Sequence, residues 1–431
     1  MISSALSIAV SALRAHSYAT EITSHNVANA ATPGYRRQRV ELQTAFPRQG
    51  PLGQMGAGVE AARITRASDR LADLRVRSST AQAGYFGSRA QVMQTMEVVF
   101  GEPTQGVTKE LTAMWDAFAT LSVSPSDSAA RYQVLSALQS TADRINQVGA
   151  GLDQLSADAS RRLSGDVAEA NDLITRLAEL NRFPRTSGGL PADMADERDR
   201  AIDQLAATLG TVATIEDDGQ TRVTLNGLAV VDGEIGTHLT VAAPPAVGVV
   251  THPTGPVTLG GSVGGLQAAL RTDIADARAD LDAFTADLVA ALNTTHATGF
   301  TPAGASGGPL LTIVSGQVTV AVTQAADLAA TDVVGQTQNG RTADALAELR
   351  NTQGDAYRSL VTSLSGRIGG IVRSSETAST VADEASLQRD SGLGVNLDEE
   401  MTDLMSQQRA YQAAAKLVTL IDDMLQSLIQ M

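Results

Sequence analysis

The two ends of the chain constrain its fold most strongly, because both read as long helices with a narrow apolar stripe. Near the N-terminus, Leu6, Ala9 and Leu13 recur at the roughly 3.5-residue spacing of a coiled-coil seam. The C-terminal stripe is longer and comprises Leu397, Met401, Leu404, Gln408, Tyr411, Ala415, Val418, Ile421, Leu425 and Leu428. Neither stripe is wide enough for a fully buried helix, so each needs a partner surface. We therefore expect residues 2–29 to pack against residues 396–429, or against a neighbouring copy of the chain.

Composition narrows the class of protein. The chain has 431 residues, enough for two or three domains, and no cysteine, so disulfides and thiolate metal sites are excluded. Aromatic residues are only 3%, which disfavours a large aromatic-lined substrate pocket, and the net charge of −15 argues against a general nucleic-acid surface. The five histidines show no metal-ligand spacing: His16, His25, His238, His252 and His296. We expect no metal and no cofactor.

Nothing in the sequence reads as a membrane or signal segment. No apolar run approaches the ~20 residues that span a bilayer. The N-terminal stretch lacks the pattern of a secretory signal, since its first positive side chain is Arg14 and serines interrupt its apolar residues. Sequence physics alone therefore predicts a cytosolic protein without membrane insertion.

Charge is unevenly distributed between the two ends. Residues 33–77 hold nine arginines against four acidic residues, whereas residues 376–403 hold eight acidic residues against Arg389. If the ends lie side by side, these opposite charges favour their pairing. The alternative is that both are solvated helix faces with unrelated charge.

Helical and β patterns alternate along the chain. Helices are expected over 68–100, 109–121, 124–181, 193–209, 262–296, 342–391 with an interruption near Gly354, and 397–429. Short β-branched runs separated by tight-turn residues indicate strands within 211–231, and a second loop-and-strand patch spans 299–334. The predicted fold class is mainly α with β, in discontinuous nested domains. The predicted domains are terminal helices with a linker at 1–66 plus 392–431, a helical rod domain at 67–210 plus 262–298 plus 341–391, and a small β-rich outer domain at 211–261 plus 299–340.

The turn after the first helix carries a specific motif. Asn26, Asn29, Pro33, Gly34 and Tyr35 lie in a segment that resembles the N-terminal motif of the flagellar axial family, which contains rod, hook and hook-associated proteins. His25 and Ala31 stand where asparagine is common in that family. The residue types also have a physical use, since an asparagine amide satisfies free carbonyls at a helix end while Thr-Pro-Gly reverses the chain.

Four further segments resemble the hook-associated protein 1 family within that group. They are 56–69, 196–205, 260–300 and 391–400, the last with a Leu-Gly insertion. In the last segment, Asn396 followed by Glu399 is also typical of a helix cap. The resemblance covers nearly the whole chain, but the region 299–341 is shorter than in many relatives.

This resemblance implies a structural protein, not an enzyme, that joins the flagellar hook to the filament and assembles through its terminal helices. It implies export through the flagellar type III apparatus without a cleaved signal, which would place the protein outside the cell and reverse the cytosolic prediction. The implied partners are further copies in a ring, the hook protein, the second hook-filament junction protein, and an export chaperone bound by the C-terminal helix. The residues expected in axial packing are Leu6, Leu13, Asn26, Asn29, Pro33, Gly34, Tyr35, Asn396, Leu397, Leu404, Tyr411, Val418 and Leu425.

Other interpretations remain open. A hook or distal rod protein shares both ends, and a secreted enzyme on a helical stalk is the alternative of another class. The Gly-rich run 260–265 could cradle a phosphate, but it lacks the Gly-Lys-Ser/Thr ending, and Ser262 is better explained as a helix cap. Glu399 and Glu400 could act as an acid and base pair, but adjacent helix positions diverge by about 100°. We expect them to serve the positive end of the helix dipole instead.

Overall fold

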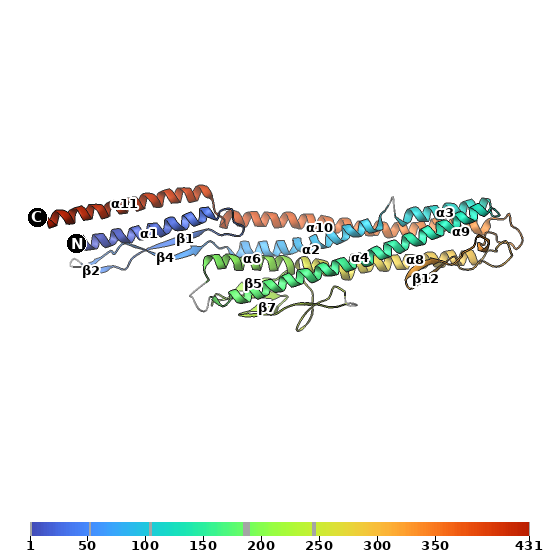
Figure 1. Cartoon of the computed structure of the whole chain (residues 1–431), viewed down its shortest axis with the longest axis horizontal. Coiled ribbons are helices and arrows are strands. Elements are labelled where there is room, and N and C mark those ends of the chain that lie inside the picture. Colours follow the sequence, from blue (N-terminus) through green and yellow to red (C-terminus); the bar gives the residue numbers. More distant parts are fainter. Residues whose placement is uncertain (1, 51–52, 103–105, 184–189, 244–246, 431) are drawn as a thin grey trace.

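The computed structural model describes residues 2–50, 53–102, 106–183, 190–243 and 247–430. The molecule is elongated, and both termini lie at the same end (Figure 1). Two long helices and a β-ribbon form that end, and a helical bundle forms the remainder. We call residues 2–66 with 394–430 the terminal unit, and residues 67–393 the rod.

Helices dominate the fold. In chain order they are α1 (Ile2–Ala28), α2 (Arg70–Phe100), α3 (Val107–Val123), α4 (Ser128–Leu180), α6 (Ala192–Leu209), α7 (Gly261–Ala268), the π-turn η1 (Ala269–Asp273), α8 (Ile274–Ala297), the 3₁₀ turn η2 (Ala325–Asp327), α9 (Arg341–Glu348), the π-turn η3 (Arg350–Gly354), α10 (Asp355–Leu393) and α11 (Leu397–Ile429). These bounds agree with the sequence-based helices to within a few residues. The interruption predicted near Gly354 is the π-turn η3.

The strands are short and all their pairings are antiparallel. They are β1 (Gln38–Thr44), β2 (Arg48–Gly50), β3 (Gly53–Met55), β4 (Val59–Arg66), β5 (Val212–Ile215), β6 (Thr221–Leu225), β7 (Leu228–Asp232), β8 (Ile235–Gly236), β9 (Thr240–Val241), β10 (Val250–His252), β11 (Gly255–Val257), β12 (Leu311–Val314) and β13 (Gln317–Val320). β1 pairs with β4, β2 with β3, and β12 with β13, while β5-β6-β7-β8 and β11-β10-β9 form small sheets. The prediction of a mainly α fold with small β parts is confirmed.

Side-chain caps and glycines set the ends of the rod helices. Asp69 caps α2, because its Oδ1 accepts hydrogen bonds from the backbone N–H groups of Leu71 and Ala72 at 2.9 and 3.0 Å. Gly101 ends α2 in the left-handed conformation, with φ of 66°. Asp127 caps α4, because its Oδ1 accepts a hydrogen bond from the backbone N–H of Ala129 at 3.0 Å. The helix start predicted at 124–127 is therefore confirmed within a few residues.

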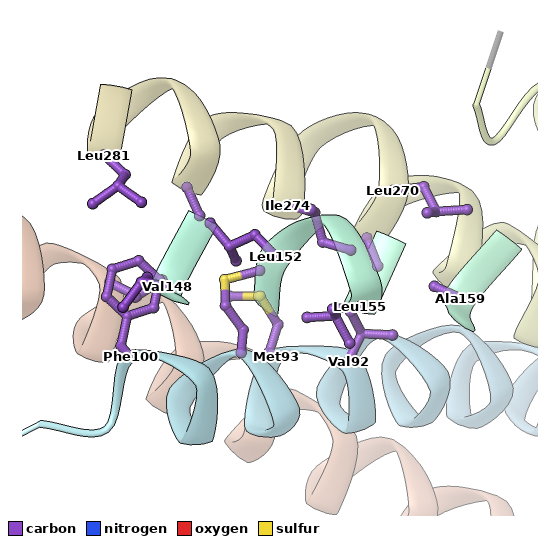
Figure 2. Close-up of a cluster of buried hydrophobic side chains, with 14 of the residues drawn as sticks. Val92, Met93, Phe100, Val148, Leu152, Leu155, Ala159, Leu270, Ile274 and Leu281 are labelled. Atoms are coloured by element: carbon purple, nitrogen blue, oxygen red, sulfur yellow. The ribbon is translucent and has the colours of Figure 1, made fainter. Parts of the chain in front are cut away.

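One continuous apolar core runs along the rod. In Figure 2, Met93 of α2 meets Leu152 and Leu155 of α4 beneath Ile274 of α8. The 53-residue helix α4 supplies a buried side chain about once per turn, so the core extends along its whole length. Full burial of each leucine, isoleucine or valine among them contributes roughly 1.5–3 kcal/mol. The rod therefore has the core of an independently stable domain.

Helix asparagines fasten the extended segments to the helices. In each case one amide both donates to and accepts from the backbone, as a neighbouring strand would. Asn171 of α4, for example, donates to the Leu239 carbonyl and accepts from the Leu239 N–H, both at 2.8 Å. The same arrangement joins Asn26 to Gln38, Asn146 to Val318, Asn181 to Thr221, and Asn293 to Leu311. We call these contacts asparagine clamps; each saturates strand groups that would otherwise be buried without partners.

The clamps also show where the β segments attach. The sheet β5 to β8 is held by Asn181, at the end of α4, whereas β13 is held by Asn146. Those two asparagines lie about ten helical turns apart. The combination of 211–261 with 299–340 into one outer domain, like the other predicted domain boundaries, stays a prediction.

The Gly-rich run serves close helix packing. A Cβ at Gly265 would lie 2.1 Å from the Tyr85 carbonyl oxygen of α2, and one at Gly264 would lie 2.1 Å from the Leu259 carbonyl oxygen. The prediction that Ser262 caps the helix is wrong. The cap position is Gly260, without a side-chain hydrogen bond, and the Ser262 hydroxyl instead contacts Asp166. Glycine is needed here so that α7 can approach the α2 backbone.

The terminal unit is more thinly packed than the rod. α1 lies between α11, which runs antiparallel to it, and the β-ribbon (Figure 1). Its described buried apolar residues are small or few: Ala9, Ala15 and Ala19 on α1, with Ala414 and Ile421 on α11. Burial of alanines contributes far less than burial of leucines. Pairing of the two ends therefore supplies only part of the burial that long helices need.

Candidate functional site

The motifs at the two ends meet in space at one place, the junction between the terminal unit and the rod. We call this place the joint. It is built from the turn after α1, the link between α10 and α11, and helix α6. A cavity of about 330 Å³ lies there, lined by Ala30 to Arg36, by Asp199, Arg200 and Asp203, and by Arg389, Asp390, Leu393, Gly394 and Val395.

The turn after α1 is shaped by its own asparagine and glycine. Asn29 donates its side-chain amide to the His25 carbonyl at 3.0 Å, and the same carbonyl also accepts the Asn29 backbone N–H at 3.1 Å. Gly34 has φ of +76°, and a Cβ there would lie 2.8 Å from Cγ of Arg200. Both the backbone conformation and the contact with α6 therefore require glycine at this position.

Asn26 is the centre of the hydrogen-bond network at the joint. Its Nδ2 donates to the Gln38 carbonyl at 2.8 Å and to Oε2 of Glu400 at 2.9 Å. Its Oδ1 accepts from the Gln38 N–H at 3.0 Å and from the Tyr35 hydroxyl at 2.8 Å. The side chain is buried, and its full hydrogen-bonding capacity is used. Asn26 therefore holds the turn, the ribbon and α11 together.

Tyr35 completes this network. Its hydroxyl lies 2.9 Å from Nδ1 of His25 while it donates to Asn26. Burial, together with the negative charges of Asp196, Asp193 and Glu400, raises the pKa of Tyr35 above its ordinary value. The phenol therefore stays protonated and remains a donor at physiological pH.

Arg37 connects the turn to α11. Its guanidinium group lies 2.8 Å from Glu399, 2.5 Å from Glu400 and 3.1 Å from Asp403. Its backbone N–H donates to the Leu393 carbonyl at 3.1 Å. Glu399 and Glu400 lie in the first turn of α11, where the helix dipole favours negative charge, and both also pair with Arg37. Their expected role at the helix dipole stays a prediction. Glu400 is only 1% exposed, so its charge depends on that pairing.

Asn396 caps α11, as the sequence predicts. Its Oδ1 accepts a hydrogen bond from the Asp398 N–H at 3.0 Å. The helix thus begins where Arg37 reaches its first turn.

A second cluster of ion pairs ties the N-terminal segment to the rod. Arg36 lies 2.6 Å from Asp73 of α2 and 3.5 Å from Asp199 of α6. Arg66, at the end of β4, pairs with Asp196 and lies 2.8 Å from Asp199. All five residues are buried or nearly so. Loss of one partner from such a buried pair typically costs about 3–5 kcal/mol.

Burial and ion pairing act on these acids in opposite directions. Burial raises the pKa of Asp196, and Arg66 only partly offsets it. Burial also acts on Asp199, but the neighbouring Arg198, Arg66 and Arg36 outweigh it and lower the pKa of that carboxyl. Asp199 is therefore the anionic centre of the cluster.

Most of the described buried ion pairs of the arginine-rich segment 33–77 are made with helix α6, which the sequence analysis did not expect. Of the arginine-rich segment, Arg37 meets the acidic segment 376–403, as the pairing hypothesis requires. Arg36 and Arg66 bind Asp199 of α6 instead, and Arg77 lies 2.7 Å from Asp203 of the same helix. Sequence reasoning missed α6 as a partner. The signal was present, because Asp196, Asp199 and Asp203 have the i, i+3, i+7 spacing of one helix face.

The apolar residues expected in axial packing differ in their burial. Leu6 and Leu13 on α1 are partly buried, as are Leu404, Val418 and Leu425 on α11. Leu397 and Tyr411 are 51% and 44% exposed, and Tyr411 lines a pocket with Ser17 and Thr20 of α1. Pro33 and Gly34 lie on the exposed turn. The role of all these residues in assembly stays a prediction.

The described residues offer no recognisable catalytic or metal centre. Among them no three His, Asp or Glu side chains gather as a metal site would require. Within the same residues, no helix combines the length and apolar character needed to cross a membrane.

Comparison with protein families gives three matches along the chain. The flagellar hook-associated protein FlgK helical domain matches residues 93–311. The flagellar basal body rod FlgEFG protein C-terminal family matches residues 388–431, and the flagella basal body rod protein family matches residues 6–36. The two ends and the rod thus match families of the same organelle.

Individual proteins give the same result. The chain is 26% identical over 492 aligned positions to flagellar hook-associated protein 1 of Bacillus subtilis (strain 168), covering 97% of this chain and 96% of that protein. It is 24% identical to the protein of the same name from Salmonella typhimurium, over 73% of this chain and 60% of that one. The structure of the flagellar hook junction protein FlgK from Burkholderia pseudomallei aligns with a TM-score of 0.51 and 23% identity, over 56% of this chain and 46% of that chain. That likeness supports the fold.

Proposed function

The chain belongs to the flagellar hook-associated protein FlgK family, and we propose that it joins hook to filament by packing its terminal unit into the axial tube of the flagellum. It is a structural component of the bacterial flagellum, with the hook-filament junction role of its family. The observation that carries the packing proposal is a set of large apolar side chains along α11 that stay about half exposed.

We call this set the exposed α11 residues. Its residues are 44 to 55% exposed and comprise Leu397, Met401, Met405, Tyr411, Leu417, Leu420 and Met424. A row of large exposed apolar residues along one helix marks a surface for another protein. In the proposed function, terminal helices of neighbouring subunits cover it.

Partners and localisation follow from this proposal. The protein interacts with other flagellar proteins as part of the organelle, outside the cell. We infer that its neighbours are further copies in a ring, the hook protein below and the second hook-filament junction protein above. We infer export through the flagellar type III apparatus, with an export chaperone on α11, and no role for a cofactor, metal, nucleic acid or membrane insertion.

The small buried apolar area of the terminal unit is consistent with export before assembly. An amphipathic helix gains too little from burying alanines to offset its ordering entropy, so α1 and α11 are expected to fold only among partners. The rod, with its own core, folds first. The subunit thereby keeps its ends free until it reaches the hook.

Substitution at the α1 contact tests the packing proposal. Leu404→Asp or Leu425→Asp buries a charge between α1 and α11, so the protein should fail to join the hook while the rod stays folded. Leu387→Asp is the matched control, because Leu387 is a 72% exposed leucine of the rod helix α10. Immunogold microscopy of hooks and fluorescence of the sole tryptophan, Trp115 in α3, measure the two properties. Normal incorporation of Leu404→Asp would contradict the proposal.

Deletion of the protein tests its place in the flagellum. Electron microscopy should show bare hooks, with filament protein shed into the medium. Missing hooks would instead favour the alternative of a hook or distal rod protein, which shares both ends of the chain. The FlgK helical-domain match over 93–311 supports the junction role over that alternative.

The chaperone proposal has its own test. Removal of residues 396–431 should abolish binding of the purified chaperone, and unchanged binding would count against a site on α11. The enzyme alternative has no observation in its favour, since the matched proteins are named as structural flagellar proteins.

A further inference from the structure

The two ion-pair clusters at the joint meet at adjacent residues of the chain. Glu400 of α11 binds Arg37, and the adjacent residue Arg36 binds Asp199 of α6. Arg66 of the ribbon binds Asp199 as well. We call the cluster around Asp199 the Asp199 network; it meets the Arg37 cluster only through the backbone of residues 36 and 37.

The rod alone does not balance the charges of this network. On the rod side there are five carboxylates, Asp73, Asp196, Asp199, Asp203 and Asp390, and three guanidinium groups, Arg77, Arg198 and Arg389. Docking of the N-terminal segment adds the guanidinium groups of Arg36 and Arg66. Without that segment, a face of α6 would carry carboxylates that lack their closest partners.

The two added arginines arrive together. β1 and β4 pair so that Gln38 lies opposite Arg66, which places Arg66 beside the turn that carries Arg36. Arg36 and Arg66 therefore reach Asp199 as one piece when the ribbon has formed.

The C-terminal end is needed as well. Arg37 has a side chain only 12% exposed, and its most buried partner, Glu400, has a side chain only 2% exposed. Among the described residues Arg37 is the one cation paired with Glu400, and a buried carboxylate without its partner is strongly destabilising. Arg37 cannot be placed without Arg36, its neighbour in the chain. Docking of one end thus requires the other.

We propose that the joint is an electrostatic latch that closes only when both ends of the chain fold beside each other, and that closing it fixes the direction in which the terminal unit leaves the rod. This inference rests on the proposed function, in which the ends fold during assembly. Arg36, Arg37, Arg66 and Glu400 are positioning residues, which set the orientation of α1 and α11. A subunit with one end misplaced leaves the latch open and is not incorporated.

Two matched pairs of full-length variants test the latch in a strain that lacks the native copy. Arg66→Gln opens a buried pair, whereas Arg63→Gln on the same strand breaks an exposed pair with Glu41. Glu400→Gln removes the buried partner of Arg37, and Glu399→Gln removes an adjacent partner that is 59% exposed. We expect the buried-site variants to lower incorporation at hooks at least about tenfold and the exposed-site variants to stay within about twofold, because exposed pairs contribute little. The Trp115 unfolding transition should stay unchanged in all four.

The double variant Arg66→Gln with Glu400→Gln separates a latch from two independent structural losses. If both ends must dock for the latch to close, the double variant incorporates no worse than the single variants. Multiplication of the two losses, or incorporation of Arg66→Gln at the level of Arg63→Gln, would overturn the latch. A shift of the Trp115 transition in Arg66→Gln would overturn it too, since the residue would then be stabilising the rod itself. If the unmodified chain is itself absent from hooks, the proposed function fails instead.

Discussion

The rod and the terminal unit have similar helix lengths but differ in how their helices are covered. In the rod, α4 buries leucine, isoleucine and valine side chains along its whole length, and the sole tryptophan is fully buried. In the terminal unit, α1 buries alanines, and α11 leaves a row of leucines and methionines exposed. Amphipathic helices of comparable length thus serve two purposes, a core that stands alone and a surface that needs partners.

The largest expected effect lies in the rod. Gly265→Val would place side-chain atoms against the Tyr85 carbonyl and force α7 away from α2, so we expect the rod to lose more than about 4 kcal/mol or fail to fold. The control is Gly165→Ala on α4, where a Cβ meets nothing within 4 Å, with an expected gain of up to about 1 kcal/mol. Denaturant unfolding followed by Trp115 fluorescence measures both. A folded Gly265→Val rod of native stability would show that the close packing is not required.

The same substitution, asparagine to aspartate, in one clamp of each region should affect the rod and the terminal unit differently. Asn181→Asp removes the donor to the Thr221 and Gly233 carbonyls in the rod and should cost about 3 kcal/mol in the same assay. Asn26→Asp removes the equivalent donor in the terminal unit. We expect it to leave the Trp115 transition unchanged and to prevent incorporation at the hook. An equal loss of rod stability in both variants would contradict the distinction between the regions.

Acid should weaken the distal part of the rod through His296. Its Nδ1 donates to the Gly308 carbonyl at 2.6 Å, and its Nε2 accepts from the Ala329 N–H at 2.7 Å, so the buried ring is neutral. Burial lowers the pKa of His296 below its ordinary value of about 6.5. A depressed histidine pKa favours folding above the unfolded-state pKa, and that stability is lost as the pH falls through 6.5 and below. The loss is at most about 1.4 kcal/mol per pH unit.

The unfolding free energy, measured at pH 7.5 and at pH 5.5, gives the contribution of His296. His296→Gln should show a weaker pH dependence than the native chain over this interval. An identical dependence in both proteins would assign the effect to another group.

The smallest expected effect on stability comes from substituting the exposed α11 residues. Met405→Gln should change the unfolding free energy of the free chain by less than about 0.5 kcal/mol, because Met405 is already half exposed. Incorporation at hooks should nevertheless fall. If Met405→Gln destabilises the free chain but does not affect incorporation, the exposed α11 residues stabilise the subunit's own fold and do not bind a neighbour.

Much of the fold could be predicted because it depends on local patterns. The helix bounds follow from periodicity and from caps such as Asp127, and the turn at Pro33 and Gly34 follows from backbone chemistry. The asparagine clamps were not predicted, because each joins residues far apart in the chain. Their one local sign is an asparagine inside a helix, a position that the residue type does not favour.

The joint was predicted only in part. The ion pairs between Arg37 and the acidic residues of α11 were predicted from the opposite charges of the two ends. Arg36 and Arg66 with Asp199 could not be predicted, because α6 lies more than a hundred residues away and nothing local says which helix meets the turn. Ser262 was misassigned for a related reason. The glycines of that segment are required by close packing, as at Gly265 against the Tyr85 carbonyl, and not by the capping of the helix start.

Hydrogen exchange of the free, full-length chain tests the central claim most directly. The rod should protect its amides through global unfolding, whereas α1 and α11 should open locally at little cost. We expect residues 5–24 and 405–427 to exchange within seconds while the buried stretches of α2 and α4 stay protected for hours. Equal protection of α1, α11 and the rod helices would show that the terminal unit is stable alone, and would contradict the account.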